Sequence, residues 1–417
     1  MKKYLFLTLA LLTASTAFIS CDDDDDNKKS KDSVYSDKRY GNEAIDACND
    51  LVDALTKANS AIATSKVSEY EDELRGIIDN VVDKVIVPTY TNLADDTESL
   101  LNNLNGLDVN SLSQDAINNA CNDFKKARKH WEQSEAFLGG VASDFDVDPT
   151  IDSWPLNRTL LISYLASGRT DFTDEELDDA SILGFHALEF ILFRNGKPRQ
   201  MSEFKGNDTY KGFEKISGAT ELAYAQRICQ LLYARTCQLQ VAWEGPTTDN
   251  EARMNLVKSA GLEYQTTKGC SFGENMKKAG DTSLSTFPTI VSAIAQLLAN
   301  DEGSCVGITD EVGNAKIANP FSSGEVSYVE SPFSHNSITD FQDNIRSVRN
   351  IWLGSLDGKT ASKSFSKFFS NHSTSRGRAV EDVYTNAIAK IGAIPAPFVK
   401  YVSTIWGIAY EDSELKE

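Results

Sequence analysis

The chain has 417 residues, of which 41% are hydrophobic and 24% are charged, so it can form one large or two ordinary globular domains. Its formal charge of −20 argues against binding to DNA or RNA, because contacts to phosphate supply most of the affinity for nucleic acids. The sequence has no glycine-rich nucleotide motif and no GxSxG, which argues against nucleotide chemistry and against a nucleophilic hydrolase.

The N-terminus MKKYLFLTLALLTASTAFISC has the layout of a secretory signal, with Lys2 and Lys3, an apolar run, and small residues before Cys21. The ending FISC resembles a bacterial lipoprotein signal, in which cleavage before the cysteine is followed by its acylation. We therefore expect a signal peptide over residues 1–20 and a lipid on Cys21. Removal of the signal takes away two lysines and no acids, which leaves a charge of −22. The lipid would attach the protein to the outer membrane, facing the periplasm or the cell surface.

Residues 21–39 include the run DDDDDNKKSKDS, which has nothing to bury and predicts a disordered acidic tether. Acidic residues directly after an acylated cysteine also resemble the export signal that some Gram-negative lineages use for surface lipoproteins. Six further cysteines follow, and outside the cytoplasm their even number permits disulfides without requiring them. No CxxC pair is present, which argues against a thiolate zinc site.

From residue 40 onward the periodicity is helical almost everywhere, and runs with strand-like alternation are scarce. Two stretches look irregular, 194–208 and 301–335, and the first divides the chain into halves of similar length. We therefore predict an all-α protein of two helical-bundle domains, 40–205 and 206–417, packed side by side. The predicted helices lie near 42–62, 68–103, 111–140, 153–167, 173–193, 218–244, 248–260, 284–300, 337–354, 363–370, 376–392 and 396–411.

The predicted helix 111–140 carries an acid in its apolar stripe. Ala127, Trp131 and Glu135 recur at a spacing of four, so Glu135 occupies a position that faces the core. Glu132 lies beside this stripe and can pair with Arg128 one turn earlier, which leaves open whether it holds a ligand or a structural ion pair.

The next stretch, DVDPTIDSWPLNR, contains Asp152, which can act as a carboxylate of a site or, like Ser153, as the cap of the following helix. The preceding DFDVD resembles the start of a calcium loop. Pro149 and Pro155 stand where an EF-hand requires glycine and glutamate, so this interpretation fails.

The predicted helix 173–193 opens with TDEE, a capping-box pattern, and contains LGFHALEF. His186 and Glu189 are one turn apart, so both side chains can address one point in space. Gly184 costs such a helix about 1 kcal/mol relative to alanine, which predicts the close approach of another backbone or of a ligand. The simpler alternative is a satisfied core pair of His186 and Glu189 without any ligand.

A donor set typical of metal sites in helical bundles is formed by one histidine and several carboxylates on neighbouring helices, here His186, Glu189, Glu135, Asp152 and Glu132. Nitrogen and oxygen ligands without thiolate suit iron, manganese or zinc. Because a carboxylate-rich site with one histidine is a poor zinc site, we favour iron over zinc as the divalent metal.

Gly184, His186 and Glu189 form the motif GxHxxE. Three further motif stretches are HWEQSEAF around Trp131, IDSWP with Trp154, and SHNSITDFQDNI followed by IWLG. With these motifs the chain resembles the imelysin-like family. The resemblance implies an all-helical envelope protein with two bundle-like domains and a functional pocket near their interface. It also implies that the metal-associated residues are Glu132, Glu135, Asp152 and His186. Family members include iron-regulated proteins, insulin-cleaving metallopeptidases and the periplasmic partner of a ferrous-iron transporter, but this chain lacks the cupredoxin domain that some transport members carry.

Three functions remain open from the sequence. The first is a lipid-anchored metal-binding protein that serves iron uptake or sensing, with iron-transport components as partners. The second is a metallopeptidase with Glu189 as the catalytic base and His186, Glu135 and Asp152 as ligands, although the zinc motifs HExxH and HxxEH are absent. The third is a surface lipoprotein that binds a partner and whose buried polar cluster is structural.

Overall fold

The computed structural model describes residues 34–173, 176–300 and 303–409. The predicted signal peptide, the lipidation site Cys21 and the tether up to residue 33 lie outside the described residues. Within these ranges every helix is too short or too polar to span a membrane. The six cysteines that the structure describes are all free thiols.

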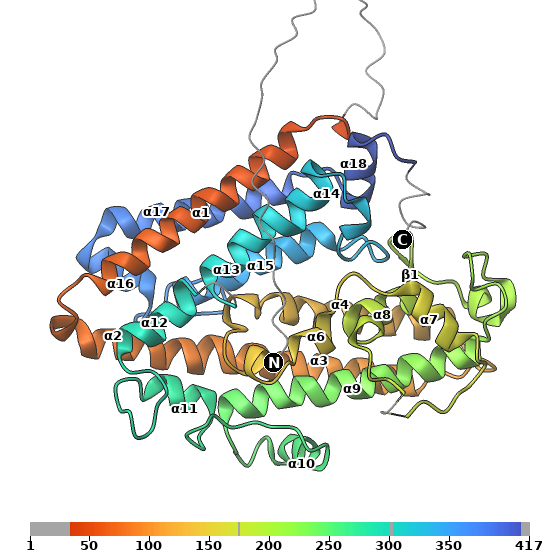
Figure 1. Cartoon of the computed structure of the whole chain (residues 1–417), viewed down its shortest axis with the longest axis horizontal. Coiled ribbons are helices and arrows are strands. Elements are labelled where there is room, and N and C mark those ends of the chain that lie inside the picture. The colour runs from red at the N-terminus through yellow and green to blue at the C-terminus, as the bar shows by residue number, and fades with distance from the viewer. Residues whose placement is uncertain (1–33, 174–175, 301–302, 410–417) are drawn as a thin grey trace, which may run out of the picture.

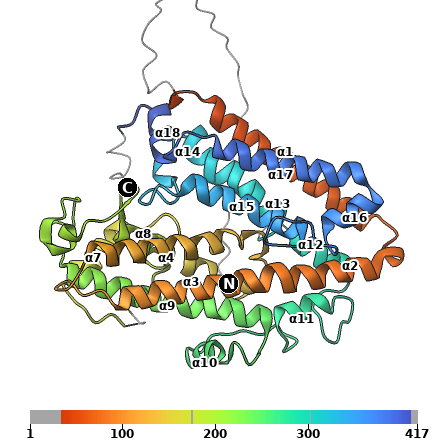
Figure 2. The same ribbon diagram turned by 180° about the vertical axis from the view of Figure 1, so that it is seen from behind.

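The protein is built from helices, as the sequence predicts. Strands in the described ranges amount to one short antiparallel hairpin of β1 (Phe193–Arg194) and β2 (Lys197–Pro198). The helices form two layers, which lie one above the other in Figure 1 and again in the opposite view of Figure 2.

The upper layer in Figure 1 is centred on α1 (Arg39–Ala63), which packs along α17 (Thr374–Gly392). One face of α1 is apolar and buried because Cys48, Leu51, Leu55 and their neighbours recur at spacings of three and four. The other elements of this layer are α12 (Ile290–Leu298), α13 (Cys305–Glu311), the π-helix η6 (Val312–Ile317), α14 (Ala318–Ser322), η7 (Val326–Tyr328), α15 (Ser337–Leu353), α16 (Phe365–His372) and α18 (Phe398–Ile405).

In the lower layer α3 (Val87–Asn105) packs against both α4 (Gln114–Glu132) and α9 (Gly218–Glu244). Ser217 caps α9, since its side chain accepts a hydrogen bond from the Ala219 amide. The other elements are α2 (Val67–Val81), η2 (Val82–Ile86), η3 (Glu135–Phe137), α5 (Val141–Asp144), α6 (Asp148–Asp152), α7 (Arg158–Leu165), η4 (Ala180–Ile182), α8 (Gly184–Leu192), η5 (Glu203–Asn207), α10 (Glu251–Ser259) and α11 (Phe272–Lys277).

The two layers meet where α15 packs on α4 and where η3 packs on α13 and α15. One hydrophobic cluster includes residues of both layers, such as Leu51 of α1 and Phe124 of α4. Each layer combines helices from both halves of the sequence, since α1 lies against α17 and α3 lies against α9. The division of the chain near residue 205 therefore remains a prediction.

The predicted helix 111–140 is shorter in the structure. It begins after the cap Ser113 and ends at Glu132, so Glu135 starts a separate 3₁₀ turn, although its side chain is buried as expected. The expected cap at Asp152 or Ser153 is wrong, because Asp152 ends α6 and Asn157 caps α7.

The predicted helix 173–193 begins only at Gly184. The Thr173 amide does donate to the Glu176 carboxylate at 3.1 Å, as in a capping box, but no long helix follows. Leu183 has an extended backbone (φ −110°, ψ −177°), which separates η4 from α8. His186 and Glu189 stay together on α8, one turn apart as the sequence predicts.

The expectation of an irregular stretch over 301–335 is wrong for most of its length, because α13, η6 and α14 lie there. The glycines of this stretch suggested a loop, but Gly313 serves packing against α1. A Cβ at Gly313 would lie 2.7 Å from the Cβ of Cys48, so glycine permits the close contact of the two helices.

Candidate functional site

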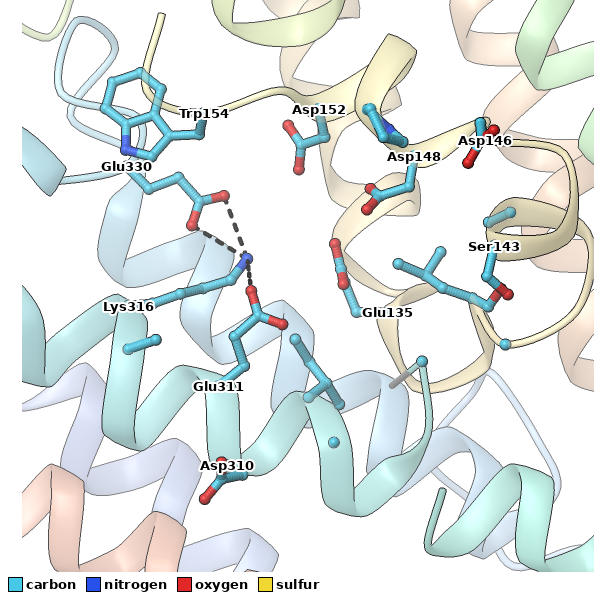
Figure 3. A pocket seen from close by; sticks show the side chains of 18 of the residues that line it. Glu135, Ser143, Asp146, Asp148, Asp152, Trp154, Asp310, Glu311, Lys316 and Glu330 are labelled. Carbon is cyan, nitrogen blue, oxygen red and sulfur yellow. Dashed lines mark hydrogen bonds and ion pairs between the residues drawn. The ribbon is translucent and has the colours of Figure 1, made fainter. Parts of the chain in front are cut away.

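A cavity of about 670 Å³ opens between two parts of the chain, residues 135–154 and residues 303–330. Figure 3 shows acidic side chains that point into it from both sides. Among the described residues that line it, seven are carboxylates and one is a base, so the cavity attracts cations. The acids are Glu135, Asp146, Asp148, Asp152, Asp310, Glu311 and Glu330, and the base is Lys316.

The inner wall of the cavity depends on the contact of Gly184 with α6. Gly184 has φ +69°, and a Cβ on it would lie 2.0 Å from the carbonyl oxygen of Ile151. Glycine therefore permits both the left-handed backbone and the close approach, as the sequence predicts for this position. The contact brings the start of α8, with His186, against the end of α6, with Asp152.

Asp152 receives hydrogen-bond donors on both of its carboxylate oxygens. Oδ1 is bound by the Arg128 guanidinium and lies 3.1 Å from His186 Nε2, and Oδ2 accepts from Trp131 Nε1 at 2.7 Å. Burial opposes ionisation of this carboxyl, but Arg128 and His186 hold its pKa well below the usual range. Asp152 is therefore a fixed negative charge at the inner end of the cavity.

Arg128 lies at the centre of four carboxylates and is buried. Besides Asp152, its Nη2 lies 2.5 Å from Glu132 Oε1 and 2.6 Å from Glu330 Oε1, and its Nε lies 3.6 Å from Asp340 Oδ2. The pairing with Glu132 one turn away is the one the sequence indicated. Since Arg128 and Glu132 do not line the cavity, this ion cluster forms the floor beneath it.

His186 and Glu189 lie behind the cavity wall. His186 Nδ1 is 3.4 Å from Glu189 Oε2, its ring packs against Trp154 at a centroid distance of 4.5 Å, and neither His186 nor Glu189 lines the cavity. Burial alone lowers the pKa of His186, but the Asp152 carboxylate outweighs it and the pKa rises to about 9. At neutral pH both ring nitrogens therefore carry protons, and the imidazolium orients Asp152.

Glu189 is fully buried and is held by Ser334, which lies in the turn before α15. Its Oε1 accepts hydrogen bonds from the Ser334 amide at 2.8 Å and from Ser334 Oγ at 2.6 Å. Ser334 belongs to SHNSITDFQDNI, so this contact explains why that stretch accompanies GxHxxE. Glu189 thus connects His186 to the second half of the chain.

Glu330 and Lys316 form the opposite wall of the cavity. Lys316 Nζ lies 3.1 Å from Glu330 Oε2 and 3.8 Å from Glu311 Oε1, and Figure 3 shows the amine pointing toward the centre of the acidic group. Burial alone lowers the pKa of Lys316, but Glu330 and the other acids raise it well above its usual range. Lys316 is therefore a permanent cation.

Glu135 and Asp148 point into the cavity from the side opposite Lys316 (Figure 3). Burial raises the pKa of Glu135 well above its usual value, and burial together with the charge of Asp152 raises the pKa of Asp148 to about 7. These two carboxyls are the ones that would gain most from a cation that enters the cavity.

Acidic side chains outnumber basic side chains in this buried cluster. Six carboxylates have nearly inaccessible side chains, whereas the permanent cations are Arg128 and Lys316, with His186 as a third at neutral pH. An uncompensated buried carboxylate costs several kcal/mol, so the excess must be met by protons or by a further cation. The six carboxylates are Glu132, Glu135, Asp152, Glu189, Glu330 and Asp340.

Apart from Cys21, which lies outside the described residues, the structure brings the predicted site residues together, although only some of them line the cavity. Glu135, Asp152 and Trp154 line the cavity, while Arg128, Trp131, Glu132, Gly184, His186 and Glu189 form its floor and support. Sequence reasoning missed Glu330, Lys316, Asp148 and Asp340. Asp340 belongs to the motif SHNSITDFQDNI at the start of α15, and its place in this motif could have identified it. Glu330 and Lys316 lie in the stretch 301–335, which the sequence predicts to be irregular.

Comparison with known proteins identifies the family of the chain. Residues 86–409, most of the chain, match the model of the Imelysin (Peptidase_M75) family. The chain belongs to the imelysin family. The resemblance to the imelysin-like family is thereby confirmed.

Two proteins that are similar to this chain carry a name that refers to iron. Iron-regulated protein A of Synechococcus elongatus is 24% identical over 323 residues, 77% of this chain and 76% of the relative. A crystal structure from Parabacteroides distasonis, solved as a candidate iron-regulated protein A precursor, has a TM-score of 0.59 at 24% identity and covers 79% of this chain and 95% of the other. An imelysin-like protein from Psychrobacter arcticum 273-4 has a TM-score of 0.44 at 13% identity, over 81% and 96% of the two chains.

The donor set fits a divalent metal on its cavity side. Two groups have ligand atoms that all lie within 4.8 Å of one another: Asp152 with His186 and Glu330, and Asp152 with Glu132 and Glu135. Arg128 already bonds to both groups from below. The members of these two groups that also line the cavity, and so could hold a metal ion there, are Glu135, Asp152 and Glu330.

Proposed function

We propose that this imelysin-family protein binds a divalent metal ion, iron in preference to zinc, at the inner end of the acidic cavity and serves iron uptake or sensing in the cell envelope. The observation that carries the proposal is the excess of buried carboxylates over buried cations around Asp152. The raised pKa values of Glu135 and Asp148 support it, because a carboxyl that is protonated without metal can exchange its proton for a metal ion.

The chemistry of the donors favours iron. Carboxylate oxygens suit hard or intermediate cations, and neither a cysteine nor a histidine is among the described residues that line the cavity. The names of the Synechococcus and Parabacteroides relatives agree with a role in iron metabolism. Bound iron would supply positive charge to the carboxylates, while His186 and Arg128 keep Asp152 oriented.

The family name also allows a metallopeptidase, with Glu189 as the base. Less supports this second function, because a general base must reach water at the metal. Glu189 is fully buried, its Oε1 is occupied by Ser334, and it does not line the cavity. We therefore assign Glu189 a positioning role toward His186.

The location in the envelope is part of the same proposal. Acylation of Cys21 would anchor the chain to the outer membrane, and the tether would let the acidic cavity receive iron from, or deliver iron to, transport components. Metabolic labelling with a radioactive fatty acid should mark the wild-type protein and fail to mark Cys21→Ser.

Metal analysis after anaerobic dialysis against Fe²⁺ tests the metal site. Wild-type protein should retain about one Fe²⁺ per chain and less Zn²⁺, and the pair Glu135→Gln with Asp152→Asn should retain none. The matched control removes two charges elsewhere, with Asp95→Asn and Glu98→Gln, whose carboxylates both bind Arg253 on the surface. Retention of iron by the first pair at the level of the control pair would refute the proposed site.

A further inference from the structure

Lys316 occupies the cation position on the cavity side of Glu330. Arg128 binds Glu330 Oε1 at 2.6 Å, and Lys316 Nζ lies 3.4 Å from the same atom and 3.1 Å from Oε2. Both oxygens of Glu330 therefore have a cationic partner in this structure. A metal ion that uses Glu330 must take the place of one of the two.

The two cations differ in how easily they can leave. Arg128 is surrounded by four carboxylates beneath the cavity, and its planar guanidinium is fixed by several hydrogen bonds. Lys316 has a single flexible chain of four carbons, and its amine already lines the cavity. Lys316 is the cation that can move.

The π-helix η6 gives the amine a second partner toward solvent. In a π-helix residues five apart lie about one turn from each other, so Lys316 sits next to Glu311, which immediately precedes η6. On an α-helix the same two residues would point about 140° apart. The Glu311 carboxylate is 3.8 Å from Lys316 Nζ, and the Glu311 side chain is 53% exposed.

We propose that Lys316 is a built-in substitute for the metal ion: its ammonium neutralises Glu330 in the metal-free protein and swings toward Glu311 when a divalent metal binds. This inference rests on the proposed metal site and adds Lys316 as the group that competes with the metal ion for Glu330. The exchange replaces one positive charge by two in a cluster that has excess negative charge. Lys316 thus keeps the empty cluster folded and weakens metal binding enough for release.

Anaerobic Fe²⁺ titration of Lys316→Met, wild type and a control variant tests the competition. Lys316→Met should bind Fe²⁺ about tenfold tighter or more, because no ammonium must be displaced. Lys316→Arg should bind more weakly than wild type, because a guanidinium can bind Glu330 through two hydrogen bonds. The control is Lys277→Met, which also removes an amine that pairs with a carboxylate. Lys277 lies 2.5 Å from Asp83 and does not line the cavity, so this substitution should leave the affinity for Fe²⁺ unchanged.

Amine labelling tests the movement itself and needs only the wild-type protein. With saturating Fe²⁺, acylation of Lys316, measured by mass spectrometry, should rise several-fold, while Lys277 stays constant. Unchanged or reduced labelling of Lys316 in protein that has bound iron would overturn the displacement, and equal or weaker iron binding by folded Lys316→Met would overturn the competition. Absence of iron binding by wild type and by every variant would instead refute the proposed function, so the two failures can be told apart.

Discussion

Replacement of Gly184 by alanine tests how the family motif builds the site. Two separate effects follow from the geometry. Alanine at φ +69° costs roughly 1–2 kcal/mol because its Cβ crowds the following carbonyl in left-handed backbone. In addition, the new Cβ would lie 2.0 Å from Ile151 O and 2.5 Å from Ile151 C, where ordinary contacts begin near 3.4 Å. Moving α6 away to relieve this overlap adds about 1–3 kcal/mol.

Gly261 offers a control that has only the first effect. Its φ is +66°, and a Cβ there would meet nothing within 4 Å. Gly261→Ala should therefore lower the free energy of unfolding by about 1–2 kcal/mol, and Gly184→Ala by about 2–5 kcal/mol. Because Ile151 precedes Asp152, Gly184→Ala should also weaken Fe²⁺ binding, which Gly261→Ala should not.

Urea denaturation followed by tryptophan fluorescence measures the stability difference, and anaerobic titration measures the affinity. The same loss of stability in both variants would show that the contact with Ile151 does not matter. An unchanged iron affinity in Gly184→Ala would refute the idea that this contact positions Asp152.

Three further outcomes follow from the charges of the cluster. Arg128→Met should cost about 3–5 kcal/mol of stability, because it leaves four buried carboxylates without their shared cation. Lys57→Met, at the exposed pair of Lys57 with Asp53, should cost about 1 kcal/mol or less, and comparable losses in denaturation would contradict this. Burial raises the pKa of Glu135 well above its usual value of 4.5 in the folded protein, so the unfolded chain releases its proton first and the metal-free stability falls as the pH rises above about 4.5. Glu135→Gln should reduce this fall, and an identical pH profile would refute the assignment. Finally, Fe²⁺ at about one hundred times its dissociation constant should stabilise the protein by about 2.7 kcal/mol, and a chelator should reverse it; a midpoint that Fe²⁺ leaves unchanged would count against specific binding.

The predictable parts of the molecule are those whose signals are local. His186 and Glu189 could be placed together because they are one helical turn apart, and the contact at Gly184 could be predicted because glycine is unfavourable inside a helix. The burial of Glu135 followed from a stripe of apolar residues, even though α4 ends before it.

The site residues that could not be predicted from the sequence depend on contacts between distant parts of the chain. Glu330 binds Arg128 across 202 residues of sequence, and no periodic pattern marks it. Lys316 points into the cavity from a π-helix, whose register differs from that of an α-helix and which the periodicity of α-helices does not reveal. The glycines of that stretch suggested a loop, although Gly313 instead permits packing against α1.

The most direct test of the metal site is a crystal structure of protein loaded anaerobically with Fe²⁺, with diffraction data recorded on both sides of the iron absorption edge. The proposed function predicts one strong anomalous peak at the inner end of the cavity, in contact with Glu135 and Asp152, and a Lys316 amine withdrawn from Glu330. Iron-loaded crystals with the peak outside this cavity, or with no ordered peak, would contradict the proposal.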